Sequence, residues 1–194
     1  RLIKLPGKID SGQVLLNGTS LYESYDMYRN AIGYVPQDDI IHRELTVERS
    51  LTYTAQLRLP SDTSPAQIEQ QVTSVIETLG LGLVRKTPVP NLSGGQRKRV
   101  SIGCELLTRP SLIFLDEPTT GLDPEGRIEV WKIVKELAKS GTTVFLTTQY
   151  LEEAEQLADR IAILHESKII ANGTLAELKS LFPPAKVEYV EKQP

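Results

Sequence analysis

The sequence predicts an α/β fold, with a parallel sheet core into which a helical subdomain is inserted. Two continuous apolar runs, at 112–115 (LIFL) and 143–146 (TVFL), are separated by a helical pattern. Apolar strands joined by helical crossovers are typical of a parallel sheet that helices cover on both faces. The stretch from Thr46 to about Gly80 is dominated by helix start and stop signals, which indicates the helical subdomain.

The first half of the chain opens with two short strand candidates, 12–17 (GQVLLN) and 32–35 (IGYV), which are apolar and bounded by turn residues. Thr46 is placed to cap a helix that continues to about Leu57. Ser64 then starts a capping box with proline at the first helical position. One apolar stripe marks the buried face of this second helix: Ile68, Val72, Ile76 and Leu79.

The second half contains the two apolar strands and a smaller C-terminal group of elements. A helix between the strands carries its apolar positions at Ile128, Trp131, Ile133, Val134 and Leu137. A helix at 151–158 precedes an antiparallel pair of strands at 161–164 and 168–171. Thr174 starts another capping box and a last helix, and the tail at 186–194 is an edge strand or disordered.

The composition limits the classes of function. The 194 residues, 40% hydrophobic and 24% charged, fit one globular domain. The net charge of −3 lacks the basic field of nucleic-acid binders, so no nucleic acid is expected as a partner. No apolar run approaches the roughly 20 residues that cross a bilayer, and no secretory leader is present, so a cytosolic protein is expected. The single cysteine, Cys104, is expected to be a buried thiol.

Two adjacent carboxylates, Asp116 and Glu117, directly follow the apolar run at 112–115. Ligands bind at the carboxyl ends of parallel strands. An aspartate there can hold Mg²⁺ through water, and the next residue, which points the other way, can activate an attacking water. The pair alone also fits a strand that leaves the core into a solvated turn, so both interpretations stay open at this point.

The segment 91–96 (NLSGGQ) places a serine and two glycines directly before a helix rich in Arg97, Lys98 and Arg99. Unobstructed backbone N–H groups and a hydroxyl at a helix N-terminus suit an anion. The alternatives are an ordinary glycine turn with a capping serine, and a basic trio that forms a solvated face.

Five segments occur in a characteristic order and spacing. LSGGQ at 92–96, LIFLDEP at 112–118 and GLD at 121–123 resemble the signature, Walker B and D-loop motifs of the ABC ATPase family. YVPQ at 34–37 resembles the Q-loop of that family, and LTVE at 45–48 resembles the segment that opens its helical subdomain. The joint match is highly specific, because unrelated proteins would need several coincidences to show it.

The resemblance extends over about residues 2–181 and implies a P-loop NTPase-like α/β fold. The core is expected at 1–45 and 110–181, and the helical subdomain with the signature motif at about 46–109. Residues 182–194 form a C-terminal tail in this division.

Roles for individual residues follow from the resemblance. It implies that Gln37 touches Mg²⁺ and senses membrane subunits, that Asp116 binds Mg²⁺ through water, and that Glu117 is the general base. In this family two domains sandwich two ATP molecules head to tail. Asp123 is expected at the dimer seam, and the residues expected to contact the γ-phosphate of ATP held by the second subunit are Ser93, Gly94, Gly95 and Gln96.

The sequence departs from the family pattern in two places. The glycine-rich Walker A loop, which should precede 1–5 (RLIKL), is absent, so the N-terminal part of the core is expected to be missing and the fragment inactive. Gln149 stands where the family usually has a catalytic switch histidine, so Gln149 is expected to act as a catalytic residue that orients the attacking water. The alternative is a degenerate switch in a slow or inactive site. His42 and His165 are expected in surface loops, where they do not replace this histidine.

The predicted function is the ATP-binding and ATP-hydrolysing motor domain of an ABC transporter, at the cytoplasmic face of a membrane. The segments YVPQDD and LTTQYLEEAEQLADRI are similar to those of lipid and drug half-transporters and of bacterial drug exporters, which favours an exporter. Expected partners are ATP, Mg²⁺, a second ATP-binding domain and transmembrane domains. The alternatives are an ABC-type ATPase of a non-transport system, or a non-hydrolysing partner or regulatory module. The solute is not encoded in this sequence.

Overall fold

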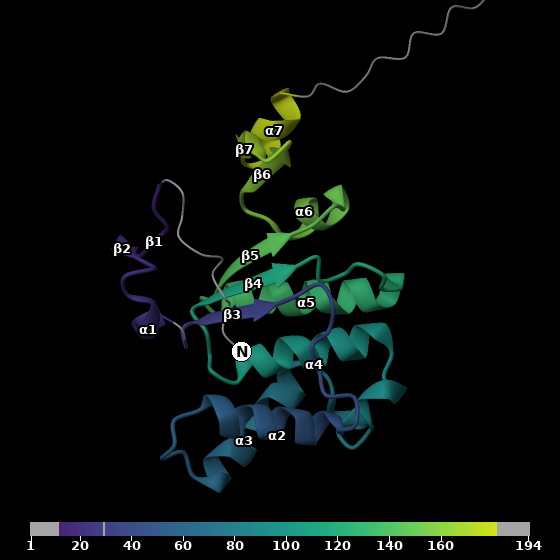
Figure 1. Cartoon of the computed structure of the whole chain (residues 1–194). Coiled ribbons are helices and arrows are strands. Elements are labelled where there is room, and N and C mark those ends of the chain that lie inside the picture. Colours follow the sequence, from purple (N-terminus) through teal and green to yellow (C-terminus); the bar gives the residue numbers. More distant parts are fainter. Residues whose placement is uncertain (1–11, 29, 182–194) are drawn as a thin grey trace, which may run out of the picture. The chain divides into compact units, whose positions relative to one another are not determined.

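A computed structural model describes residues 12–28 and 30–181 of the chain (Figure 1). The chain divides into two compact units, of which the first ends at Gln149 and the second begins at Tyr150. The predicted tail at 186–194 lies outside the described residues. The α/β class with a parallel sheet is confirmed, because the first unit builds its core from parallel strands and helices.

The central sheet contains three parallel strands in the order β3-β4-β5. These are β3 (Ile32–Val35), β4 (Leu112–Asp116) and β5 (Thr143–Thr147), and their positions agree with the apolar runs of the sequence. Phe114 of β4 lies opposite both Tyr34 and Phe145 in the register. All three strands therefore end at the same edge of the sheet.

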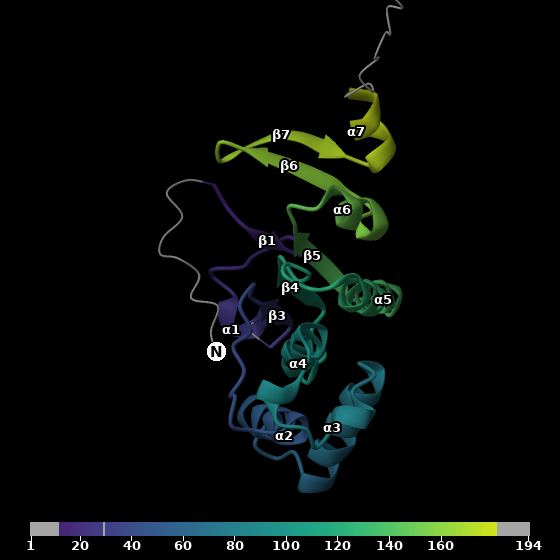
Figure 2. The same ribbon diagram turned by 90° about the vertical axis from the view of Figure 1, so that its right-hand side faces the viewer.

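The two faces of this sheet differ in how far other elements bury their side chains. One face carries the fully buried side chains of Val35, Ile113 and Leu115, and α4 (Gly94–Leu106) and α5 (Pro124–Lys139) lie on one side of the strands (Figure 2). The other face carries aromatic residues that are partly exposed, with the Phe114 and Phe145 ring centroids 5.3 Å apart.

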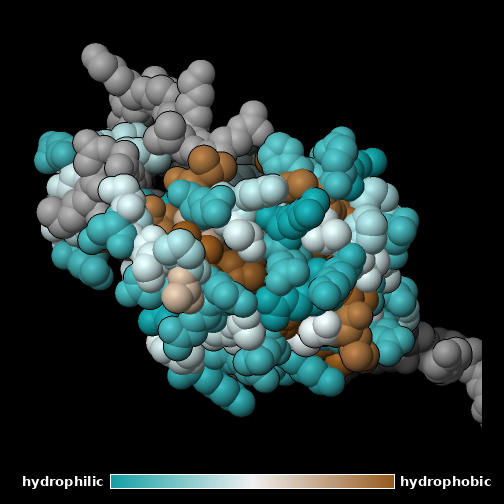
Figure 3. Space-filling view, turned by 90° about the horizontal axis from the view of Figure 1, so that it is seen from below, coloured by the Kyte–Doolittle hydropathy of each residue, from teal (hydrophilic) through white to brown (hydrophobic). Residues whose placement is uncertain are grey.

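The helices that follow β3 begin at the predicted caps. In α2 (Val47–Arg58) the Thr46 hydroxyl accepts a hydrogen bond from the Arg49 N–H at 3.3 Å. In α3 (Pro65–Thr78) Ser64 and Gln67 form both bonds of a capping box. Two short 3₁₀ helices, η1 (Gly82–Val84) and η2 (Val89–Asn91), lead to α4. Apolar residues such as Tyr53 and Leu57 of α2 are exposed, and on the face that Figure 3 shows, hydrophobic residues are interspersed among hydrophilic ones.

The N-terminal strand is shorter than predicted. Only Leu15–Leu16 of the segment 12–17 form β1, which pairs antiparallel with β2 (Thr19–Ser20). The turn between them uses Asn17 and Gly18, both with positive φ angles (52° and 79°), which is the chemistry of a tight hairpin. A four-residue helix, α1 (Tyr25–Tyr28), follows.

The second unit contains α6 (Leu151–Leu157), the antiparallel strands β6 (Ile161–His165) and β7 (Lys168–Gly173), and α7 (Leu175–Leu181). The hairpin and the capping box of α7 agree with the prediction. The Thr174 N–H donates to the Glu177 carboxylate at 2.8 Å, and the Glu177 N–H donates to the Thr174 hydroxyl at 3.3 Å. Within the described residues, none of the helices combines the length and the apolar character needed to span a membrane.

Helix α4 lies between the sheet and α5 on one side and α2 and α3 on the other (Figure 2). Two glycines allow this close packing. A Cβ atom on Gly103 would lie 2.8 Å from a methyl carbon of Leu79. A Cβ atom on Gly95 would lie 3.0 Å from the Cα of Gly126 in α5, where backbone meets backbone. The second signature glycine therefore has a packing role inside the fold.

Gly95→Ala should lower the free energy of unfolding by about 1–3 kcal/mol, because the added methyl group meets backbone that must shift. Gly94→Ala is the matched control. Its Cβ would meet only the end of the Leu122 side chain, at 3.1 Å, and it should change stability by less than about 0.5 kcal/mol. Urea unfolding of both variants measures the difference in stability. Equal unfolding midpoints for Gly95→Ala and Gly94→Ala would argue against the packing role of Gly95.

Cys104, also on α4, is a partly buried free thiol whose sulfur accepts a hydrogen bond from the Thr54 hydroxyl at 3.7 Å. Burial raises the pKa of this thiol from 9.0 to about 11. The thiolate is the reactive form. Between pH 7 and 9 the fraction of Cys104 present as thiolate should therefore be far smaller in the native protein than in the unfolded chain.

At about pH 8 the native Cys104 thiol should react with an aromatic disulfide reagent roughly 100-fold more slowly than the thiol of the urea-unfolded chain. The native thiol keeps its proton to a higher pH than the thiol of the unfolded chain. The free energy of unfolding should therefore also fall as the pH rises from about 9 to 11. Cys104→Ala should lack this additional decline. Equal labelling rates in the native and unfolded protein would contradict the raised pKa.

Candidate functional site

Asp116 is the last residue of β4, at the edge where the three parallel strands end. Hydroxyl groups from both neighbouring strands hold its carboxylate. The Thr147 hydroxyl of β5 donates to Oδ1 at 2.6 Å, and the Tyr34 hydroxyl of β3 donates to Oδ2 at 3.3 Å. Burial is the largest cause of the raised pKa of Tyr34, and the negative charge of Asp116 and this hydrogen bond raise it further. The register of the sheet thus fixes the orientation of Asp116.

Glu117 has a positive φ angle of 43°, which is unusual for a residue other than glycine. Its N–H donates to the carbonyl oxygen and to the hydroxyl of Thr147, both at 3.1 Å. These bonds hold the strained backbone while the chain turns away from β4. Backbone strain of this kind costs on the order of 1–3 kcal/mol and clusters at functional sites.

The two carboxylate oxygens of Glu117 accept hydrogen bonds from different segments. The Thr120 hydroxyl donates to Oε2 at 3.0 Å, and the Gln149 side-chain amide donates to Oε1 at 2.8 Å. The structure therefore brings together the two residues that the sequence analysis predicted to be catalytic. A carboxylate oriented from both sides, half-buried at a strand end, can receive a proton from a bound water.

The signature turn forms the start of α4, and its two polar side chains complete a capping box. The Gln96 N–H donates to the Ser93 hydroxyl oxygen at 3.2 Å, and the Ser93 N–H donates to the Gln96 side-chain oxygen at 3.0 Å. The capping alternative is thus correct in structural terms. It does not compete with anion binding, because the Ser93 hydroxyl accepts in this pair and keeps its own hydrogen for donation.

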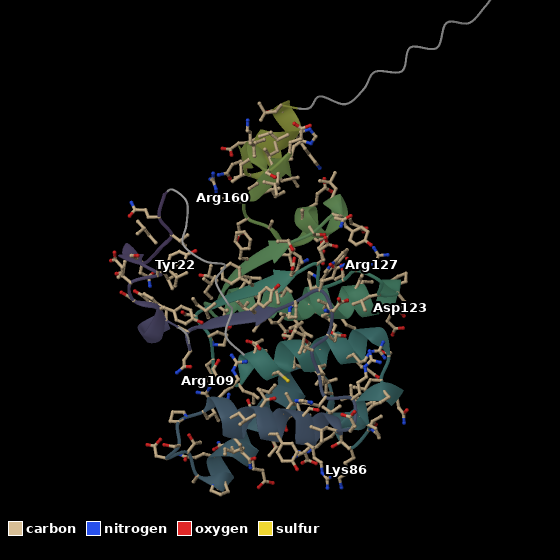
Figure 4. The ribbon with its side chains drawn as sticks, in the orientation of Figure 1. Tyr22, Lys86, Arg109, Asp123, Arg127 and Arg160 are labelled. Atoms are coloured by element: carbon tan, nitrogen blue, oxygen red, sulfur yellow. The ribbon has the colours of Figure 1, made fainter. Side chains whose placement is uncertain are left out.

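Asp123 caps α5 and lies near the signature turn. Its carboxylate accepts a hydrogen bond from the Gly126 N–H at 3.1 Å, at the start of the helix (Figure 4). Gly95 approaches Gly126 closely, and Gly94 approaches Leu122. The starts of α4 and α5 therefore form a second group of predicted site residues, beside the group formed by Asp116, Glu117 and Gln149.

Gln37 follows the end of β3 by two residues and is exposed. Its backbone carbonyl accepts a hydrogen bond from the Lys98 ammonium at 2.8 Å. Lys98 and Arg99 are only 3% and 8% exposed, so the interpretation of the basic trio as a solvated face is wrong for these two residues. They turn inward because the helical phase of α4 directs them at neighbouring elements of the same unit.

The sequence motifs did not indicate the hydroxyl groups that hold the carboxylates, which belong to Tyr34, Thr120 and Thr147. A signal for Thr147 existed, since it ends an apolar run that lies beside β4. His42 is exposed as expected. His165 is also exposed, but it ends β6 and does not lie in a loop.

The carboxylate oxygens at the sheet edge suit a hard cation that is also coordinated by a bound substrate. The described residues include no group of three or more His, Cys, Asp or Glu side chains able to hold a metal ion by themselves. Mg²⁺ typically uses one or two carboxylates together with substrate phosphates and water. The single oriented carboxylate of Asp116 fits that mode.

Comparison with known proteins gives this site its context. A family model described as "ABC transporter" matches residues 2–120. The chain is 41% identical over 171 residues to the daunorubicin/doxorubicin resistance ATP-binding protein DrrA of Streptomyces peucetius, which covers 88% of this chain and 51% of DrrA. It is 44% identical over 149 residues to the ABC transporter ATP-binding/permease protein Rv1747 of Mycobacterium tuberculosis, which covers 75% of this chain and 17% of that protein.

The chain therefore spans about half the length of DrrA and a smaller part of Rv1747. Among solved structures, cbiO1 from Clostridium perfringens, described as part of the ABC transporter complex cbiONQ, matches with a TM-score of 0.77 and 28% identity. This match covers 88% of this chain and 69% of cbiO1. The family model, these relatives and the shared fold show that the chain belongs to the ATP-binding domains of the ABC transporter family.

Proposed function

We propose that the chain is the larger part of an ATP-hydrolysing motor domain that drives an ABC exporter. The observation that carries this proposal is the geometry around Glu117, whose carboxylate accepts hydrogen bonds from Thr120 and Gln149 directly beside Asp116. A base, its orienting donors and a cation-binding carboxylate are among the protein groups that phosphoryl transfer to water uses.

In this mechanism Glu117 takes a proton from the attacking water, and Gln149 and Thr120 keep its carboxylate in position. Asp116 and the exposed side chain of Gln37 are the residues that would hold Mg²⁺, Asp116 through water. The ion, when bound, would supply charge neutralisation at the phosphates of ATP. The Gln149 amide can donate one hydrogen bond and accept another, as a neutral imidazole does, and it does not titrate near neutral pH.

The second group of site residues supports a sandwich of two domains. Ser93, Gly94, Gly95 and Gln96 form the N-terminus of a 13-residue helix, where backbone N–H groups and the helix dipole favour an anion. We propose that this turn contacts the γ-phosphate of ATP held by a second domain, with Asp123 at the seam. In the proposed domain division, residues from about 46 to 109 form the helical subdomain, between core parts at 1–45 and 110–181.

An exporter of drugs or lipids is the proposed setting, with transmembrane domains as partners. Its support is the function that the names of several relatives state. Besides DrrA, the linearmycin resistance ATP-binding protein LnrL of Bacillus subtilis is 33% identical over 171 residues. The human retinal-specific phospholipid-transporting ATPase ABCA4 is 34% identical over 172 residues.

Glu117→Gln in the full-length protein should lower the rate of ATP hydrolysis by roughly 100- to 10,000-fold, because the amide keeps the shape of the side chain but cannot take a proton. ATP binding should persist, so nucleotide-dependent dimers should accumulate. Steady-state hydrolysis and size-exclusion chromatography with Mg-ATP measure the two effects. The matched control is Glu136→Gln on the exposed side of α5, and unaltered hydrolysis in Glu117→Gln would remove Glu117 as the base.

Gln149→Ala should cost about 2–4 kcal/mol of transition-state stabilisation, comparable with deleting one preorganised donor. The reason is the lost 2.8 Å hydrogen bond to Glu117. The native rate should show no titration near the histidine pKa of about 6.5, whereas Gln149→His should introduce one. Hydrolysis rates across pH 5–9 test both statements. If the native protein and Gln149→Ala hydrolyse ATP equally fast, Gln149 has no part in the mechanism.

A further inference from the structure

Lys98 is a buried cation whose partners, among residues 12–28 and 30–181, all belong to the loop after β3. Its residue surface is 3% exposed. The ammonium donates to the backbone carbonyls of Pro36 at 3.2 Å and of Gln37 at 2.8 Å. It also forms an ion pair with the Asp39 carboxylate, whose Oδ1 lies 3.0 Å from Nζ.

This arrangement satisfies most of the bonding capacity of the lysine and neutralises its charge. An ammonium has three N–H donors, of which two bond to the carbonyls of Pro36 and Gln37, while the Asp39 carboxylate balances the charge as an ion pair although its Oδ1 receives no hydrogen bond. A buried charge without such partners is strongly unfavourable. The native position of the loop is therefore the one that provides partners for the Lys98 ammonium. A displacement of the loop would leave this buried charge unpaired.

The other end of this connection is held by several contacts. Lys98 lies two residues after Gln96, whose side chain closes the capping box with Ser93. The next residue, Arg99, bonds to the Leu79 carbonyl at 3.1 Å and pairs with Glu129 of α5 at 2.9 Å. The start of α4 is thus held by its own cap and by neighbouring helices.

We infer that Lys98 is a positioning residue that clamps the backbone of residues 36–39 to the start of α4, so that the position of Gln37 depends on that of the signature turn. Lys98 holds the Gln37 backbone carbonyl and leaves its side chain exposed, free to meet a ligand. The significance of this clamp for catalysis rests on the proposed function, but the clamp itself can be tested without ATP.

The first test uses the 194-residue chain and ¹⁵N relaxation of the backbone amides of residues 37–40. Lys98→Met keeps the length of the side chain and removes the charge. The order parameters of these amides should fall from about 0.85 to below about 0.6, while those of α5 stay unchanged. Asp39→Asn weakens the same clamp from the loop side, which covers the case in which Lys98→Met does not fold. Lys132→Met, at an exposed position of α5, is the matched control and should change nothing.

The second test measures the Mg²⁺ concentration for half-maximal ATP hydrolysis in the full-length protein. Lys98→Met and Gln37→Ala should each raise this Mg²⁺ concentration about tenfold. Because Lys98 acts through Gln37, the double variant should raise the concentration no further than either single variant. Additive effects in this cycle, or unchanged order parameters in both Lys98→Met and Asp39→Asn, would overturn the clamp. If Glu117→Gln still hydrolyses ATP normally, the proposed function fails, whereas the relaxation result still decides the clamp.

Discussion

The close packing of α4 is the constraint on which the rest of the first unit depends. This helix contacts the sheet, α5 and the α2–α3 pair at once, and Gly95 and Gly103 provide the room for it. The same helix buries Lys98 and Arg99, which anchor it to neighbouring segments. Because interiors are packed as densely as organic crystals, a small shift of α4 must be transmitted to these neighbours.

The geometry of the candidate site follows from a second constraint, the parallel register of β3, β4 and β5. It places Tyr34 and Thr147 within hydrogen-bonding distance of Asp116. Thr147 also accepts from the Glu117 N–H and so supports the positive φ angle at the turn. One threonine therefore orients the predicted cation ligand and stabilises the backbone that presents the predicted base.

Sequence signals were sufficient where the cause of a structure is local. The caps at Thr46 and Ser64 and the carboxylates at the end of β4 were predicted, since each depends on a few adjacent residues. The burial of Lys98 and the tyrosine partner of Asp116 were not predicted. Both depend on contacts between segments more than 60 residues apart in the chain, and a single sequence does not reveal which segments meet. The β1–β2 hairpin was missed although its Asn-Gly turn is a strong local signal.

The signature turn shows why a structural role and a binding role can coincide in one residue. The capping box fixes the Ser93 oxygen by making it accept from the Gln96 N–H, and this leaves the hydroxyl hydrogen available for donation to another acceptor. An anion at this terminus would thus find a donor oxygen whose position is already fixed, which lowers the entropy lost on binding. Removal of the hydroxyl would weaken the helix and the anion site together. A binding defect at Ser93 is therefore interpretable only beside a measured stability, whereas Glu117 carries no cap and separates the two effects.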